Sequence, residues 1–518
     1  MKTFKDILLW TEAGFGGKEA VVDLDRGVRW TYGDLNRAAR SVCAAYAEAG
    51  VWPGDRVGWL AMGPGADITA LSFGMRKMGV IPVVMNGRAT PEAIAWMIGN
   101  VGMRVLAYTA ETVDLLERVR AIGIPSVRHF VAVDEPVEDG HDSLARIYAE
   151  YAGADEPELE IEPDDPAVLI YTSGSTGRPK PVVHTETSWA ETARLGAHSL
   201  SLYPDSRFMA IMPPHFAAWA HITSGAVAAA ATQVCARFSP PALARAVAQG
   251  VTHLVLSPTM IRMLGEEARS TPELFADNDV RVAMLGGELA TDEVLATLRR
   301  LFPKVQRVAS HGATEAVALS AGPGDPRIEE GGALLGRPLP GAVVEIRNEE
   351  TGEVITEPGV PGCMYVRGPM VAQGIWADRE ATAATFPGGW WRSGDVVARD
   401  GQGYLTIAGR TDNVFKSGAV KVQCEEVESL LGEHPAVLEA VVVPVPDGVF
   451  GTVGHAYVRH TEEVTEDELV AWWRGRDDVP QYARPRHWTL QGRQAFPMVT
   501  AAKVDRKALR REAEKLHV

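Results

Sequence analysis

One run of this 518-residue sequence combines small residues, hydroxyl groups and cations in a way that suits a phosphate group. The run YTSGSTGRPKPVVH occupies residues 171–184. Its small and hydroxyl-bearing residues are Thr172, Ser173, Gly174, Ser175, Thr176 and Gly177. Glycines let the backbone approach a polyanion closely, hydroxyls and backbone N–H groups donate to phosphate oxygens, and Lys180 adds a positive charge. The run therefore predicts a phosphate-binding loop.

Two other interpretations of this run are weaker. A Walker loop needs GxxxxGK[ST], whereas Lys180 is followed by Pro181 and by no Ser or Thr that could hold Mg²⁺. A plain surface loop is also common for a cluster of Gly, Ser and Thr. The apolar segment before the run and the density of hydroxyls and cations favour the phosphate-binding loop.

Strand-like and helix-like segments alternate before the loop and must position it. Val57–Met62 and Val80–Met85 predict buried strands, with helix-like Ile68–Gly79 between them. Ala167–Thr172 is a further strand-like run that leads directly into the loop. Such alternation predicts the α/β class, with a large N-terminal domain of largely parallel sheets and packed helices.

The pattern changes near the C-terminus, where glycines cluster and shorter elements follow. Helix-like Glu425–Gly432 precedes strand-like Leu438–Val445, as expected in a small α+β domain. The glycine-rich segment 409–418 is the best candidate for a boundary and a hinge. We therefore expect a large domain over residues 1–409 and a small, mobile domain over residues 410–518.

Composition and charge narrow the class of protein. Hydrophobic residues make up 46% of the chain and the formal net charge is −16 at pH 7, which indicates a globular protein and disfavours nucleic-acid binding. The four cysteines form no CxxC pair, so we expect neither a disulfide framework nor a zinc site. The N-terminus lacks a signal-peptide pattern, and the apolar stretch 215–238 predicts buried core rather than a transmembrane segment. A cytoplasmic protein is expected, and no pattern indicates its oligomeric state.

The loop resembles the signature of the acyl-adenylate-forming family, which includes acyl-CoA synthetases, luciferases and the adenylation domains of peptide synthetases. The family's usual wording is YTSGTTGxPKGV, and Pro181 stands here where glycine is usual. Further segments resemble the family in its own order along nearly the whole chain: RWTYGDL (29–35), GVWPGDRVG (50–58), LGGELA (285–290), SHGATEA (310–316), GRPLPGAVVEI (336–346), YVRGP (365–369), WWRSGDV (390–396), GRTDNVFKSGAVKVQCEEVE (409–428) and PMVTAAKVDRKALR (497–510). The likeness is greatest to the acyl-CoA synthetases.

The resemblance implies an enzyme that uses ATP and Mg²⁺ to convert a carboxylic acid to acyl-AMP with release of pyrophosphate. Two unit charges about 4 Å apart cost roughly 4 kcal/mol at an effective dielectric of 20, so the carboxylate and the α-phosphate need nearby cations. Lys503 corresponds to the family's catalytic lysine and Glu315 to its Mg²⁺ ligand, while Thr314 can donate to the α-phosphate. The residues expected to contact the nucleotide are Thr172, Ser173, Gly174, Ser175, Thr176, Gly177, Lys180, Gly287, Glu288, His311, Gly312, Ala313, Asp395 and Arg410.

Each of the charged residues also has a plainer interpretation. Asp395 suits the two ribose hydroxyls because a carboxylate offers two acceptor oxygens, but it could be a turn aspartate. Arg410 can reach the ribose or a phosphate, or form an interdomain salt bridge. His311 stands where the family has an aromatic residue beside the adenine. Glu315 alone would suggest a solvated carboxylate, and Lys503 alone a solvated helix face.

The expected substrate is an acid without an amino group. Family members that activate amino acids carry an aspartate near the pocket entrance, whereas the corresponding stretch 212–225, MPPHFAAWAHITSG, has no acidic residue. His215, Phe216 and Trp219, together with Gly286, are expected to line an apolar pocket for an aliphatic or aryl acid. Ordinary core packing is the alternative for the aromatic residues.

The expected acceptor is the thiol of coenzyme A, reached after the small domain rotates about Asp412. Ser417 and Gly418 correspond to the family's pantetheine tunnel, where Ala419 replaces a second glycine. An acyl-AMP ligase that loads the pantetheine of an acyl carrier protein is an alternative. A second alternative is a degenerate, non-catalytic nucleotide-binding protein, because glycines usual in the family are missing at positions 181, 419 and 502.

Overall fold

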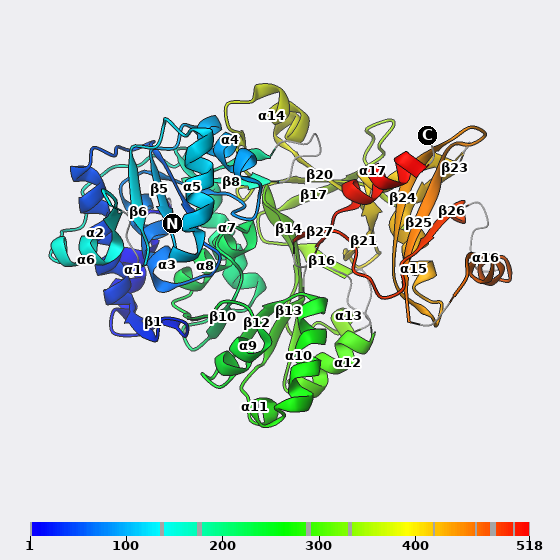
Figure 1. Cartoon of the computed structure of the whole chain (residues 1–518), viewed down its shortest axis with the longest axis horizontal. Coiled ribbons are helices and arrows are strands. Elements are labelled where there is room, and N and C mark those ends of the chain that lie inside the picture. Colours follow the sequence, from blue (N-terminus) through cyan, green and yellow to red (C-terminus); the bar gives the residue numbers. More distant parts are fainter. Residues whose placement is uncertain are drawn as a thin grey trace.

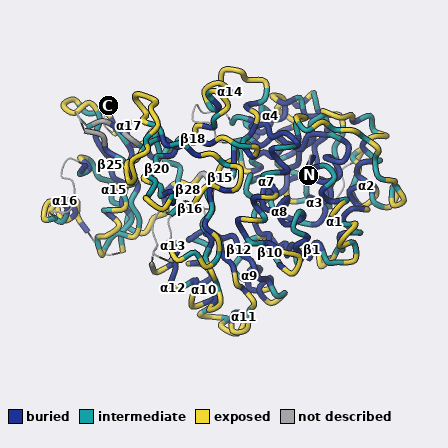
Figure 2. Tube along the Cα trace, turned by 180° about the vertical axis from the view of Figure 1, so that it is seen from behind, coloured by how far each residue is buried: buried dark blue, intermediate teal, exposed yellow. Residues whose placement is uncertain are grey.

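Two large β-sheets flanked by helices make up most of the chain, and a smaller sheet lies toward the C-terminus (Figure 1). The arrangement is seen in a computed structural model, which confirms the α/β class. The described residues are 3–134, 139–172, 179–285, 292–329, 334–417, 420–461, 464–476, 483–500 and 503–516. Buried residues gather along the large sheets, whereas α11 (Glu273–Ala276) and α14 (Arg379–Thr385) carry exposed residues at the surface (Figure 2).

The first sheet has eight strands in the order β19-β9-β8-β4-β3-β5-β6-β7. Its parallel strands are β3 (Arg56–Leu60), β4 (Ile81–Val84), β5 (Val105–Tyr108), β6 (His129–Ala132), β7 (Asp142–Ser143) and β8 (Pro166–Thr172). Every residue of β4 and β5 is buried, as expected of parallel strands covered by helices on both faces. β9 (Lys180–Thr185) runs antiparallel to β8, and β19 (Gly374–Ile375) pairs with β9 at the edge.

The segments predicted from hydrophobic patterning are confirmed, with ends that differ by at most two residues. The predicted helix between the first two strands is α3 (Ala66–Lys77). The chain leaves it through Gly79, whose φ of +68° favours glycine. The apolar stretch 215–238 forms α8 (Ala217–Ala228) and β11 (Thr232–Cys235), both largely buried as expected. Within the described ranges no helix is long and apolar enough to cross a membrane.

The second sheet has thirteen strands and changes character along its length. Strands β11, β10 (Arg207–Ala210), β12 (His253–Leu256), β13 (Val282–Leu285) and β14 (Gln306–Ala313) are parallel, and β1 (Glu19–Asp23) and β2 (Val28–Thr31) complete that end. The other end is antiparallel and consists of β15 (Ala316–Ala321), β16 (Leu334–Pro338), β21 (Leu405–Arg410), β20 (Trp391–Arg399), β18 (Gly362–Arg367) and β17 (Val343–Arg347). The parallel pairing expected from the sequence therefore holds up to β14.

The C-terminal part builds its own core beside these sheets. Its sheet contains β24 (Val437–Asp447), β25 (Gly451–His460) and β26 (His487–Leu490), and its helices are α15 (Cys424–Leu431), α16 (Glu466–Arg474) and α17 (Arg506–Leu516). A hairpin of β22 (Val414–Ser417) and β23 (Val420–Gln423) contributes Phe415 and Val422 to the same apolar cluster as Trp473. Figure 1 shows this part at one side of the molecule. The boundary at 409/410 remains a prediction.

Candidate active site

A short turn of Thr314 and Glu315 joins β14 to β15. The pairing of these strands shifts between His311 and Gly312, and a Cβ on Gly312 would lie 2.6 Å from the carbonyl oxygen of Ala316. A side chain at position 312 would therefore displace the hairpin. The Glu315 carbonyl oxygen accepts a hydrogen bond of 2.8 Å from the backbone of Ala372. Burial raises the pKa of the Glu315 carboxyl group.

Asp395 forms the centre of a charged cluster near this turn. It lies on β20 opposite Arg410, the last residue of β21. Arg410 Nη1 donates to Asp395 Oδ1 at 2.6 Å, and His311 Nε2 lies 3.0 Å from Oδ2. Only 4% of Asp395 is exposed. Burial by itself would raise the pKa of Asp395, but the hydrogen bonds and charges of His311 and Arg410 outweigh it and lower that pKa.

This cluster gathers residues that are distant in the sheet. Three strands lie between β14 and β20 in the strand order, so the sheet must curl strongly for His311 to reach Asp395. Glu315 interacts electrostatically with both Arg410 and Asp395. The structure therefore brings together four residues singled out in the sequence, while Ala313 beside them is exposed.

The ends of the predicted phosphate loop lie on the hairpin of β8 and β9. Thr172 and Lys180 are paired residues, and Thr172 Oγ1 lies 3.5 Å from the Lys180 carbonyl oxygen. This hairpin is tied to the Thr314–Glu315 turn, because His184 on β9 has its Nε2 2.7 Å from the Thr314 carbonyl oxygen. The predicted residues outside the described part are Ser173, Gly174, Ser175, Thr176, Gly177, Gly286, Gly287, Glu288 and Gly418.

The residues predicted to line the acid pocket are packed at the start of α8. His215 is buried, its ring centroid lies 4.5 Å from that of Phe216, and burial lowers the pKa of its imidazole to about 4. Trp219 packs edge-on against Trp59, with ring centroids 5.8 Å apart. A small cavity of about 10 Å³ lies against Trp219 and is otherwise lined by Phe208, Ala210, Met212, Ile222 and Thr223. The surroundings are apolar, and a role as a gate remains a prediction.

The predicted catalytic lysine belongs to a short hairpin before the last helix. Lys503 begins β28 (Lys503–Val504), which pairs with β27 (Met498–Thr500). In the projection of Figure 1, the segment with β27 leaves the small sheet and passes toward β14 and β16. The side chains of Lys503 and of the predicted hinge residue Asp412 lie outside the described part. Ser417 ends β22, directly before the undescribed residues 418–419.

Several contacts at these elements were not expected from the sequence. His184 closes the run that contains the phosphate loop, but its partner Thr314 is 130 residues away. Gln423 Nε2 donates to the Arg410 carbonyl oxygen at 3.2 Å, across the predicted hinge at Asp412. Arg506 forms a partly buried salt bridge with Glu428. The dense charged and polar residues of segment 409–428 marked it as a site of contacts, but they did not indicate the partners of Gln423 or Glu428.

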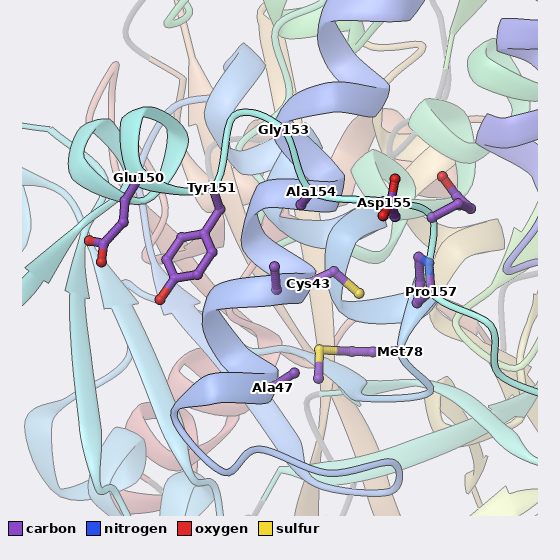
Figure 3. Close-up of a pocket in the computed structure, with 11 residues that line it drawn as sticks. Cys43, Ala47, Met78, Glu150, Tyr151, Gly153, Ala154, Asp155 and Pro157 are labelled. Carbon is purple, nitrogen blue, oxygen red and sulfur yellow. The ribbon is translucent and has the colours of Figure 1, made fainter.

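A second, larger cavity lies away from the predicted site. It has a volume of about 540 Å³ between α2 (Tyr32–Glu48) and the chain after α6 (Leu144–Glu150). Cys43 and Ala47 project from α2 toward the segment that carries Tyr151 and Asp155 (Figure 3). Because no residue of the predicted site lines it, this cavity does not take part in the arrangement described above.

Known proteins resemble both parts of the chain. Residues 8–376 match the AMP-binding enzyme family, and residues 426–503 match the AMP-binding enzyme C-terminal domain. A benzoate–CoA ligase of Thauera aromatica is 31% identical and covers 83% of this chain and 80% of its own length. A long-chain-fatty-acid–CoA ligase of Mycobacterium tuberculosis is 27% identical over 95% of both chains. A solved anthranilate CoA ligase in complex with anthranoyl-AMP has a TM-score of 0.86 at 25% identity, over 99% of this chain and 98% of that chain.

Proposed function

Because the chain belongs to the AMP-binding enzyme family, we propose that this acid–thiol ligase activates a carboxylic acid as acyl-AMP and transfers the acyl group to coenzyme A. The observation that carries the proposal is the Asp395 cluster. Among the described side chains, Asp395 Oδ1 accepts a hydrogen bond from Arg410 and Oδ2 bonds to His311, which leaves each oxygen one further acceptor position. A charged carboxylate with two such positions suits the two hydroxyls of a ribose.

In the first half-reaction, a carboxylate oxygen of the acid attacks the α-phosphorus of ATP. The bond from that phosphorus to its bridging oxygen breaks, and pyrophosphate leaves with the electron pair. The Thr314 hydroxyl would donate to the α-phosphate, Lys180 and the neighbouring loop would bind the outer phosphates, and Lys503 would supply positive charge between the two anions.

Glu315 could supply the protein carboxylate that a phosphate-bound Mg²⁺ needs. Mg²⁺ in nucleotide sites is held by one or two carboxylates together with phosphate oxygens and water. Burial raises the pKa of Glu315, and a bound cation would relieve the cost of its charge. Among the described residues no group of three or more His, Cys, Asp or Glu could hold a metal ion, so an all-protein cage is not the expected arrangement. When bound, Mg²⁺ would offset charge on the phosphates.

In the second half-reaction, the thiol sulfur attacks the acyl carbonyl carbon. The bond from that carbon to the phosphate oxygen breaks, AMP leaves, and the thiol proton passes to solvent. Lys503 is needed only in the first half-reaction, so we propose that the small domain, residues 410–518, rotates about Asp412 between the two. Ser417 and Gly418 would then border the pantetheine arm. The names of the relatives support coenzyme A rather than a carrier protein as the acceptor.

The substrate is proposed to be an aryl or aliphatic acid without an amino group. The described residues around Trp219 are apolar or hydroxyl-bearing, and none is acidic, so an α-ammonium group would lack a partner. The two relatives described above are named for benzoate and for long-chain fatty acids, which supports the same class.

The test is a pyrophosphate-exchange screen over aryl, aliphatic and amino acids, repeated with coenzyme A, with a pantetheine-bearing acyl carrier protein and without an acceptor. We expect exchange with at least one acid without an amino group, and thioester formation with coenzyme A. Turnover with the carrier protein alone would contradict the proposed acceptor. ATP binding without exchange for any acid would contradict the whole proposal and favour a non-catalytic protein.

A further inference from the structure

The imidazole of His184 joins two elements of the proposed site. None of its surface is exposed. Its Nε2 lies 2.7 Å from the Thr314 carbonyl oxygen and its Nδ1 lies 3.1 Å from Ser188 Oγ. The ring therefore bridges β9, which follows the phosphate loop, and the turn that carries Glu315.

The hydrogen bonds around His184 define one arrangement of its protons. A carbonyl oxygen can only accept, so Nε2 carries the hydrogen and donates it to Thr314. Ser188 Oγ accepts a hydrogen bond of 2.9 Å from the Thr185 backbone and can donate its own hydrogen to Nδ1. Thr185 and Ser188 form the N-terminal cap of α7 (Glu186–Ser199), so the imidazole is oriented by a helix end that the fold already fixes.

The hydrogen-bond partners of the Thr314–Glu315 turn show what the contact with His184 does. Its two carbonyl oxygens are each held from outside the hairpin, that of Thr314 by His184 and that of Glu315 by the Ala372 backbone. A backbone fixed at both residues also fixes the origin of both side chains. Burial lowers the pKa of His184 to about 4, which keeps the ring uncharged at neutral pH.

We propose that His184 is a positioning residue that aligns the Thr314 hydroxyl and the Glu315 carboxylate with the phosphates bound by the preceding loop. The inference rests on the proposed function, because it assigns phosphate and Mg²⁺ contacts to this turn. His184 itself contacts neither the substrate nor the metal ion in this proposal. Its effect is transmitted through the backbone of the turn.

Three substitutions separate this role from simple packing. His184→Met keeps a long apolar side chain but removes the donor to Thr314. His184→Gln places an amide N–H about where Nε2 lies and should keep the hydrogen bond to the Thr314 carbonyl oxygen. His221→Leu is the matched control, because His221 is also buried, its ring centroid lies 6.2 Å from that of His184, and its Nε2 has no hydrogen-bond partner among the described residues.

The measurement is calorimetric binding of ATP with Mg²⁺ and with EDTA, together with the Mg²⁺ concentration for half-maximal pyrophosphate exchange. Removing the donor leaves a buried carbonyl unsatisfied, so we expect His184→Met to reduce the Mg²⁺-dependent gain in ATP affinity about tenfold. His184→Gln should stay within about threefold of the unaltered protein and His221→Leu within about twofold. Thermal unfolding shows whether each variant is folded.

If His184→Met does not fold, Ser188→Ala is the second variant. It keeps the imidazole but removes the hydroxyl that bonds to its Nδ1, and it should reduce the Mg²⁺-dependent gain in ATP affinity about threefold. The inference would be overturned if His184→Met folds and keeps the full Mg²⁺-dependent gain in ATP affinity. Where His184→Met does not fold, an unchanged gain in Ser188→Ala would overturn it. So would an equal loss in His221→Leu. An unaltered protein that binds Mg²⁺ and ATP but exchanges no pyrophosphate would overturn the proposed function instead, and the binding comparison would still test His184.

Discussion

At the scale of single residues, the charge state of Asp395 decides whether the proposed nucleotide site works. The carboxylate is buried, yet its pKa is lowered because His311 and Arg410 outweigh the cost of burial. A group with a lowered folded-state pKa stabilises the fold at every pH above its unfolded value of about 3.9. That stabilisation is lost as the pH falls through the folded-state value.

Replacing Asp395 by Asn should therefore have an effect that depends on pH in a defined way. We expect the free energy of unfolding to fall by about 1–2 kcal/mol at both pH 8 and pH 6, because Arg410 and His311 lose a charged partner. The difference should begin to shrink as the pH falls below about 4, and it should vanish only once the pH is below the lowered folded-state pKa of Asp395. Denaturant titrations at three pH values measure this, and a difference that grows as the pH falls would contradict it.

The same variant should bind AMP about tenfold more weakly, because one charge-assisted acceptor for the ribose is lost. Asp400→Asn is the control for binding. It lies in the turn between the same two strands, where it pairs with Arg327, and should leave the affinity for AMP unchanged.

Lys503→Ala should separate the two half-reactions. We expect adenylation to fall about 10²–10³-fold, because the charge between the carboxylate and the α-phosphate is lost. Thiol transfer from supplied acyl-adenylate should stay within about threefold, since that step does not use this charge. Lys507→Ala, on the exposed side of α17, should change neither. Equal losses in both half-reactions would show that Lys503 has a different role.

At the scale of secondary-structure elements, one salt bridge positions the segment that carries Lys503. Arg506 is the first residue of α17, and both its Nη atoms contact the Glu428 carboxylate on α15. Arg506 Nη1 also donates to the Val442 carbonyl oxygen at 3.1 Å. Burial opposes the charge of Arg506, but Glu428 overrides it and raises the pKa of the guanidinium. The hairpin of Lys503 is thus followed directly by an anchored helix end.

Arg506→Met should lower the free energy of unfolding by about 2 kcal/mol, because it leaves the Glu428 charge partly buried without a partner. Adenylation should fall as well, since the Lys503 hairpin loses its anchor. The double variant with Glu428→Gln should recover most of the stability, and a double-mutant cycle gives the coupling. Arg510→Met is the control on the same helix, because its salt bridge with Glu514 is half-exposed and worth only a few tenths of a kcal/mol.

The helices and strands themselves could be predicted from the sequence more fully than the strand pairing and the side-chain contacts between them. The buried strands β3 and β4 and the helix between them follow from local apolar patterning, which needs no knowledge of the rest of the chain. The antiparallel half of the second sheet could not be predicted in this way, because pairing of β20 with β21 depends on residues that are distant in space, not on a local pattern. The same limit explains why Asp395 was identified by its motif, while its contact with His311 was not.

At the scale of the whole molecule, the proposed mechanism calls for two placements of the small domain, one for each half-reaction. The described contacts at the boundary favour the placement seen here. Gln423 Nε2 donates to the Arg410 carbonyl oxygen at 3.2 Å and to Glu425, which also accepts from Asn413. Gly409 makes room for this arrangement, because a Cβ there would lie 2.0 Å from Gln423 Nε2. These contacts join the end of β21 to the first hairpin of the small domain.

Gln423→Met should shift the balance between the two placements while preserving side-chain length. The substitution removes both hydrogen bonds of Gln423 Nε2, but only the one to Arg410 spans the hinge. Loss of that part-buried hydrogen bond is worth about 1 kcal/mol, so the population of the present placement relative to the other should fall about fivefold. If the present placement serves adenylation, that half-reaction should slow by up to the same factor, whereas thiol transfer from supplied acyl-adenylate should hold or rise. Single-molecule distances between the two domains measure the populations, and Gln494→Met, at an exposed position of the small domain, is the control. Parallel losses in both half-reactions would mean that Gln423 stabilises the boundary without favouring either placement.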